Sequence, residues 1–66
     1  MTNSQRAEQA HRAIMYFEQN SGDDRENSLK DLLCNLMHWA DEQAEDFDDA
    51  LRVARMHYEA EVHEEA

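Results

Sequence analysis

The sequence predicts an all-α protein, a compact three-helix bundle with short connections, and three observations support that class. Glycine occurs once and proline is absent, whereas good helix formers such as Ala, Glu, Gln and Leu are plentiful. No segment alternates apolar and polar residues as a strand does. Apolar residues instead recur every three or four positions, as in amphipathic helices. With 66 residues, the chain has room for a single helical domain over residues 1–66.

The first helix should span about residues 4–20. Its apolar positions recur at intervals of three and four, and Ile14 and Phe17 should be its main anchors in the core. Gly22 should end the helix, because glycine adopts the left-handed backbone conformation at little steric cost. Residues that can cap the amino end with a side-chain oxygen are Thr2, Asn3 and Ser4.

The second helix should span about residues 28–43 and carries the densest apolar stripe of the chain. Ser28 and Asp31 resemble a capping box at its start. Trp39 lies at the margin of the stripe, where its indole can cover the core or contact a partner. The spacing of the stripe is that of a buried helix face, so we expect it to form the centre of the core. Its members are Leu29, Leu32, Leu33, Leu36, Met37 and Ala40.

The third helix should span about residues 47–63. Asp46 is the best residue to cap its amino end, with Asp49 in the position that completes a cap. Glu64 and Glu65 lie at the negative end of the helix dipole, so the helix should fray over residues 64–66. The apolar stripe of this helix consists of Phe47, Leu51, Ala54, Tyr58 and Val62.

The charge balance restricts the kinds of partner. Sixteen acidic residues against six basic ones give a formal net charge of -10. This charge opposes direct binding to nucleic acid or to an anionic membrane, and it favours a basic partner. Solubility alone is the alternative explanation. The apolar runs are far shorter than a membrane span of about 20 residues. We therefore expect a cytoplasmic protein, a location that a single cysteine also fits.

The connection between the second and third helices is the most acidic part of the chain, with six acids in residues 41–49. Carboxylates three or four positions apart on a helix lie about 5–6 Å apart at Cβ, so a row of them can imitate a short track of phosphates. The same acids can instead cap the third helix and face solvent. The predicted partner-binding residues are Asp41, Glu42, Glu45, Asp46, Asp48, Asp49 and Trp39.

Histidines and glutamates spaced four residues apart can place two metal ligands on one helix face. A zinc site requires three or four converging ligands, however, and such pairs are typical of helix surfaces. Cys34 and a histidine can in principle serve as nucleophile and base, but so small a bundle has little room for a substrate pocket of about 300 Å³. We expect no enzyme activity and no catalytic, cofactor or metal site. The histidine–glutamate pairs spaced four residues apart are His38–Glu42, His57–Glu61 and Glu59–His63.

Residues 32–61 resemble short acidic helical proteins of phages and other mobile elements, among them anti-CRISPR proteins. The resemblance is carried by LMHWAD at residues 36–41 and DFDDALRVARMHYEAE at residues 46–61. Residues 1–22 have no counterpart in it. The resemblance implies a stoichiometric inhibitor of a bacterial CRISPR–Cas complex, with a type I surveillance complex as one candidate. Its carboxylates would occupy a lysine- and arginine-lined channel of a Cas subunit in the cytoplasm of the bacterial host.

A second class of function remains open beside the inhibitor. The chain can be a small protein-interaction or regulatory module, antitoxin-like and homodimeric, in which the apolar stripe continues onto a second subunit. Between the two readings we favour the inhibitor, and with it a monomer.

Overall fold

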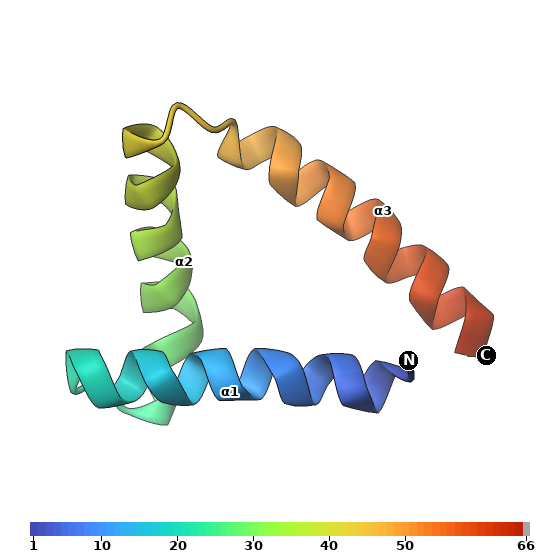
Figure 1. Ribbon diagram of the computed structural model, residues 1–66, viewed down its shortest axis with the longest axis horizontal. Helices are drawn as coiled ribbons and strands as arrows, with labels where there is room; N and C mark the ends of the chain where they lie inside the picture. Colours follow the sequence, from blue (N-terminus) through green and yellow to red (C-terminus); the bar gives the residue numbers. More distant parts are fainter. Residues whose placement is uncertain (66) are drawn as a thin grey trace.

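The computed structural model describes residues 1–65, which form three α-helices joined by short turns (Figure 1). Helix α1 spans Asn3–Ser21, α2 spans Arg25–Glu42 and α3 spans Phe47–Glu65. Each helix contacts the other two. The predicted class, an all-α three-helix bundle with short connections, is therefore confirmed. None of the helices in residues 1–65 has the length and apolar character needed to cross a membrane.

The residues that cap both ends of α1 and the start of α3 are among those expected from the sequence. The Thr2 hydroxyl accepts a hydrogen bond from the Gln5 N–H at 3.1 Å, and the Gln5 side chain accepts one from the Thr2 N–H at 2.8 Å. Gly22 ends α1 in the left-handed conformation, with φ of 77°. The Asp46 carboxylate accepts a hydrogen bond from the Asp49 N–H at 2.9 Å and so caps α3.

The start of α2 differs from the prediction. The helix begins three residues earlier, at Arg25, and its cap is Asp24, which accepts a hydrogen bond from the Asn27 N–H at 3.1 Å. Ser28 lies inside the helix instead of capping it. Its hydroxyl is within hydrogen-bond distance of the Asp24 carbonyl oxygen and of the Glu18 carboxylate. The predicted capping box of Ser28 and Asp31 is wrong, because Asp24 caps the helix and Ser28 bonds to α1.

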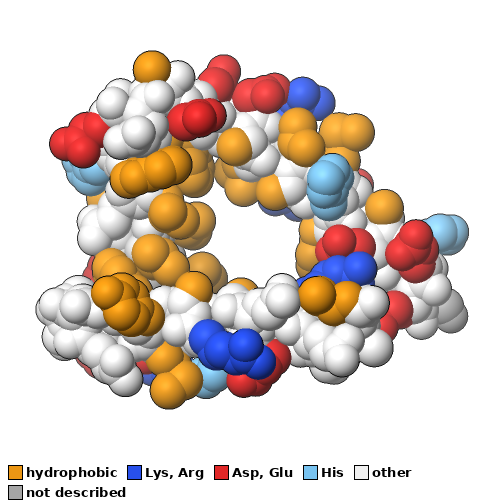
Figure 2. Space-filling view, viewed as in Figure 1, with side chains coloured by type: hydrophobic (Ala, Val, Ile, Leu, Met, Phe, Trp, Pro, Cys, Tyr) orange, Lys and Arg blue, Asp and Glu red, His pale blue; other side chains and the backbone are white. Residues whose placement is uncertain are grey.

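The expected central core is largely exposed. In residues 1–65 the one hydrophobic residue that is buried is Ala40, at 3% exposure, while the leucines of the α2 stripe are intermediate or exposed. The radius of gyration is 13.5 Å, against about 11 Å for a compact chain of this length. Figure 2 shows an opening through the centre of the molecule, with hydrophobic side chains along its α2 and α3 sides. The prediction that the stripes are buried in the centre is wrong.

The end-to-end arrangement of the helices explains this opening. Short turns connect three helices of 18 or 19 residues, and the helices meet near their ends like the sides of a triangle (Figure 1). The apolar stripes of α2 and α3 consequently diverge from the turn that joins these helices. Periodicity identified the apolar face of each helix correctly, but it did not determine what covers that face.

Polar contacts close the triangle where α1 meets α3. The Glu65 carboxylate accepts a hydrogen bond from the Asn3 N–H at 2.9 Å, and Arg6 pairs with Glu61 at 3.2 Å. The expected fraying at residues 64–66 is not found at Glu64 and Glu65, which continue α3. The positive amino end of α1 offsets the unfavourable position of Glu65. Ala66 lies outside the described residues.

Candidate protein-binding surface

The turn between α2 and α3 brings all seven predicted partner-binding residues to one part of the molecule. We call this part, residues 36–50, the α2–α3 corner. Its six acidic side chains are all exposed, and Trp39 is 55% exposed. Figure 2 shows acidic side chains gathered around this corner. Its segment 41–49 contains no basic residue, so its carboxylates form a local concentration of negative charge.

The acids of the corner fall into two groups. Asp49 pairs with Arg52 at 2.8 Å, and Asp46 is engaged as the cap of α3. The remaining four form no ion pair within residues 1–65. Acids elsewhere such as Glu26 and Glu59 are also unpaired, so what distinguishes the four is their closeness to one another in a segment without a basic residue. These four are the carboxylates most available to an external cation: Asp41, Glu42, Glu45 and Asp48.

A groove lies between the end of α2 and the start of α3. It has a volume of about 350 Å³, and most of its lining is apolar. Glu45 and Asp46 also line it, so an apolar hollow and acidic side chains adjoin each other. An aliphatic or aromatic side chain can enter such a groove while a neighbouring cation contacts the carboxylates. The apolar lining is made by Leu36, Trp39, Ala40, Phe47 and Ala50.

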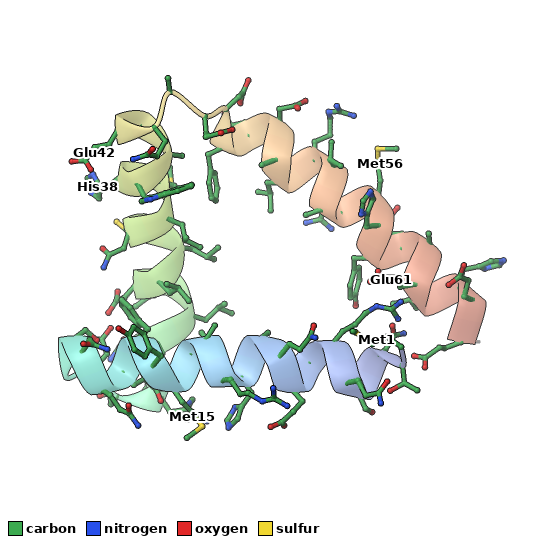
Figure 3. The ribbon with its side chains drawn as sticks, viewed as in Figure 1. Met1, Met15, His38, Glu42, Met56 and Glu61 are labelled. Carbon is green, nitrogen blue, oxygen red and sulfur yellow. The ribbon has the colours of Figure 1, made fainter. Side chains whose placement is uncertain are left out.

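The structure brings three of the predicted residues, Trp39, Glu45 and Asp46, into this groove. The other four predicted residues are exposed but do not line the groove, and Glu42 points away from it (Figure 3). Sequence reasoning missed the contribution of Leu36 and Phe47, because each was assigned to a closed core. The signal that could have found them is the meeting of two apolar stripes across a turn of only a few residues.

The other candidate chemical groups do not converge. His38 and Glu42 project together from the outer side of α2, away from the groove (Figure 3). Within residues 1–65 no cluster of three or more His, Cys, Asp or Glu side chains is arranged to hold a metal ion. Cys34 is a free, exposed thiol. The groove lining contains no serine, cysteine, lysine or histidine that its carboxylates could activate.

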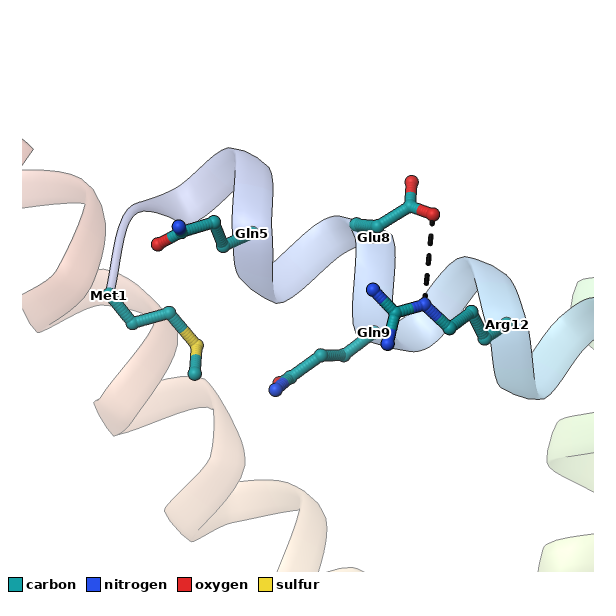
Figure 4. A pocket seen from close by; sticks show the side chains of 5 residues that line it. All are labelled: Met1, Gln5, Glu8, Gln9 and Arg12. Atoms are coloured by element: carbon teal, nitrogen blue, oxygen red, sulfur yellow. Dashed lines mark ion pairs between the residues drawn. The ribbon is translucent and has the colours of Figure 1, made fainter.

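A second hollow, of about 300 Å³, lies along the first half of α1 (Figure 4). Its lining comes from Met1 and from one face of α1, and four of its five residues are polar. Arg12 within it is already paired with Glu8 at 3.8 Å. Because this hollow combines no residues from different helices, it offers a weaker binding surface than the corner.

The junction of α1 and α2 has the most strongly perturbed electrostatics. Here Arg25 and then Ser28 hydrogen-bond the Glu18 carboxylate, and together they lower the pKa of Glu18 to about 2. The two Arg25–Glu18 bonds measure 2.7 and 2.9 Å. The neighbouring Asp31 carboxyl raises the pKa of Asp23. Glu18, Arg25 and Ser28 bond to each other within the chain, so we assign these three a structural role in fixing the angle between α1 and α2.

Comparisons with protein-family models, with curated proteins and with solved structures found no match to this chain.

Proposed function

We propose that the chain works by binding another protein, and that the outer, acidic side of the α2–α3 corner contacts a basic surface that otherwise binds nucleic acid. The observation that carries this proposal is that four exposed carboxylates without ion pairs lie in the same corner as an apolar groove, which one of them, Glu45, lines. A surface that only kept the chain soluble would not require its acids to gather beside exposed apolar groups. The combination of charge and an adjoining apolar anchor is typical of a specific interface.

Two physical effects would make such an interface work. The chain's net charge of -10 steers a cationic partner toward it and speeds association at low ionic strength. Trp39 then adds apolar contact, which persists when salt screens the charges. Carboxylates in a lysine- and arginine-lined groove displace phosphate by occupying the same cations. The chain would therefore act as a stoichiometric inhibitor without chemical turnover.

A bacterial CRISPR–Cas complex is the specific partner that we propose. The support for this choice is the resemblance of residues 32–61 to anti-CRISPR proteins, together with the acidic corner. A Cas complex presents an extended cationic channel to nucleic acid, so occlusion of that channel accounts for inhibition by so small a protein. The chemistry of the corner supports the choice of a basic surface on that complex.

The test is to measure affinity for a purified type I surveillance complex at low and high salt, with and without target DNA. We expect binding that weakens as salt rises and that competes with DNA. Neutralising the four unpaired acids in D41N/E42Q/E45Q/D48N should weaken binding by about tenfold or more, because each lost contact to a basic side chain removes charge-assisted bonds.

The matched control is E8Q/E26Q/E59Q/E64Q, which removes the same number of negative charges, four, from exposed positions outside the corner. It should retain most of the affinity, since general attraction depends on net charge but the proposed contact depends on position. Equal losses in the two variants, or binding indifferent to DNA, would count against occupation of a phosphate-binding groove.

A second candidate function is favoured by the exposed apolar stripes. In that case the chain is a regulatory, antitoxin-like module whose partner need not bind nucleic acid. Capture of partners from bacterial cells, followed by mass spectrometry, separates the candidates. A nucleic-acid-binding complex released by competing DNA supports the inhibitor, and a partner unaffected by DNA supports the regulatory module.

A further inference from the structure

Helices α2 and α3 expose an apolar surface toward the central opening. The groove of the corner places Leu36 opposite the start of α3, and a hollow between α1 and α3 is lined by Tyr58 and Val62. Other members of each stripe share these sides, because residues three, four or seven apart lie on one face of a helix. We call this surface the inner face and define it by its exposed large residues: Leu29, Leu33, Leu36, Leu51, Tyr58 and Val62.

The total accessible surface area shows how much more surface the chain exposes than a compact protein of the same mass. It is 5632 Å², whereas a compact globular protein of 7.8 kDa exposes about 4,400 Å². Each chain therefore exposes about 1,200 Å² more than its mass requires. Two copies that covered only this excess would bury about 2,400 Å² together, and one compact body of twice the mass would require about 4,000 Å² of burial. Both values lie in the range of obligate homodimers, about 2,000–5,000 Å².

The spacing of the stripes suits a contact between identical surfaces. Leu29, Leu33, Leu36 and Ala40 follow one another at intervals of four, three and four residues, which is the repeat of a helix seam that packs against another helix. The α3 stripe repeats the same intervals from Phe47 to Tyr58. A twofold dimer places the same patch of each copy in contact, so a surface must complement itself. The stripes of α2 and α3 have the same spacing of apolar residues, so each can pack against its counterpart in a second copy.

The distribution of charge selects an antiparallel arrangement. The acids of the corner cluster at the carboxyl end of α2, and its 18 residues make it about 27 Å long. Antiparallel pairing of two α2 helices separates the two acidic clusters by more than the screening length of about 8 Å. The amino end of the other α2 carries Lys30 and the positive end of the helix dipole, but also Asp24, Glu26 and Asp31, so the gain of this arrangement is the separation of the two clusters. Parallel pairing would bring twelve acids together.

We propose that two copies of this chain associate through their inner faces, with their α2 helices antiparallel, and so form the core that one copy lacks. The outer carboxylates Asp41, Glu42 and Asp48 remain exposed in this dimer, so each copy can still present its acidic surface. The dimer does not depend on the proposed inhibitor function. It covers Leu36, which also lines the groove, so in a dimer the partner of the proposed function would be contacted through Trp39 and the exposed carboxylates.

The wild-type chain provides the first test. Sedimentation or light scattering over about a hundredfold range of concentration should give the mass of two chains, falling toward 7.8 kDa only on strong dilution. The midpoint of thermal unfolding should rise with concentration, because a dimer is stabilised by mass action. A mass of one chain throughout, or a mass well above two chains, would overturn the proposal.

Matched substitutions locate the interface. Leu33 on the inner face and Met15 on the outer side of α1 are 40% and 41% exposed in a single chain. Leu51 and Met56 form a second pair on α3, in which Met56 points outward (Figure 3). A single chain should tolerate glutamate at all four positions alike, since each is already in contact with solvent and glutamate is a good helix former.

We expect L33E and L51E to weaken association by at least about a hundredfold, because each buries an unpaired charge, and M15E and M56E to remain dimeric. Loss of helical circular dichroism in L33E and L51E alone supports the proposal only where it is reversed at higher protein concentration. A loss that does not change with concentration would mean that a single chain already requires Leu33 and Leu51, and would count against the dimer. If the outer variants dissociate as fully as the inner ones, the inner face is not the interface.

Discussion

The two turns of this chain join helices of nearly equal length but produce opposite kinds of junction. At the α1–α2 elbow, which comprises residues 14–32, Ser28 is 1% exposed and Arg25 makes two hydrogen bonds to Glu18. At the α2–α3 corner the two helices leave an apolar groove and four carboxylates without ion pairs. The elbow satisfies its polar groups within the chain, and the corner presents its groups to solvent.

This difference separates the part of the chain that we expect to carry stability from the part that we propose for binding. Directional hydrogen bonds fix the elbow, because a buried hydroxyl and a charged pair tolerate few geometries. Apolar contact around Ala40 holds the corner, and apolar contact is non-directional. A substitution at the elbow should therefore disturb folding, while a substitution at the corner should disturb association.

The largest effect should come from S28L at the elbow. The larger side chain loses the hydrogen bond to Glu18 and has no space at a position that is 1% exposed, so it forces the two helices apart. We expect a loss of about 2–4 kcal/mol in the free energy of unfolding, measured by urea denaturation. The control, C34L, places leucine at an exposed position of the same helix and should change stability by less than about 0.5 kcal/mol. Similar costs for both variants would show that the elbow is not the rigid junction.

The next effect tests the groove. In a single chain Leu36 is 40% exposed, so L36A should cost only about 1 kcal/mol, below the 2–5 kcal/mol typical of a core leucine. In the proposed dimer Leu36 is covered, and the cost should approach the core value at high concentration. Chemical denaturation at several protein concentrations measures both limits. A core-like cost that does not change with concentration would mean that a single chain already buries Leu36.

The contrast also explains how much the sequence could predict. Helix class and the caps at Thr2, Gly22 and Asp46 depend on residues within one turn of each other, so local rules sufficed. The start of α2 was missed because Ser28 is a residue type that favours a cap, and its contact with Glu18 of α1, which it makes from inside the helix, cannot be seen in the local sequence. The exposure of the apolar stripes was missed for a different reason. Periodicity shows which face of a helix is apolar and carries no information on the angle at which short turns set the helices.

The sequence likewise predicted one part of the candidate site, its acidic cluster, and not another part, its groove. The acidic cluster of residues 41–49 was evident from composition, because six acids without a base remain close together whatever the fold. Which of them stay available depends on neighbours across the helix surface. Arg52 pairs with Asp49, and the backbone of α3 engages Asp46. The groove itself could not be predicted, since it arises from the divergence of two stripes that the sequence placed in one closed core.

A smaller effect is expected at the turn of the corner. Ala44 has a left-handed backbone with φ of 57°, and the Glu45 N–H donates to the Ala40 carbonyl oxygen at 2.8 Å, as in a helix ending that favours glycine. A44G removes the steric cost of the Cβ and should stabilise the chain by up to about 1 kcal/mol. The control A10G, at a helical position of α1, should destabilise it by about 0.5–1 kcal/mol. Thermal unfolding midpoints that fall in both variants would contradict this account of the turn.

The smallest effect is the pH dependence of the elbow, because Glu18 and Arg25 form their pair where solvent screens it. The pKa of Glu18 falls from 4.5 to about 2 on folding. Its ionised form therefore contributes fully to the free energy of unfolding above pH 4.5, and this contribution is lost as the pH falls toward 2. Asp23 acts in the opposite sense. Its pKa is raised by Asp31, so its contribution is present below pH 3.8 and is lost as the pH rises through the raised value. E18Q should therefore lose less stability on acidification than wild type, and D23N should be more stable than wild type at neutral pH.

Urea denaturation midpoints measured from acid to neutral pH test both variants. If the midpoint of E18Q falls with pH as steeply as that of wild type between pH 4.5 and 2, Glu18 does not stabilise the elbow.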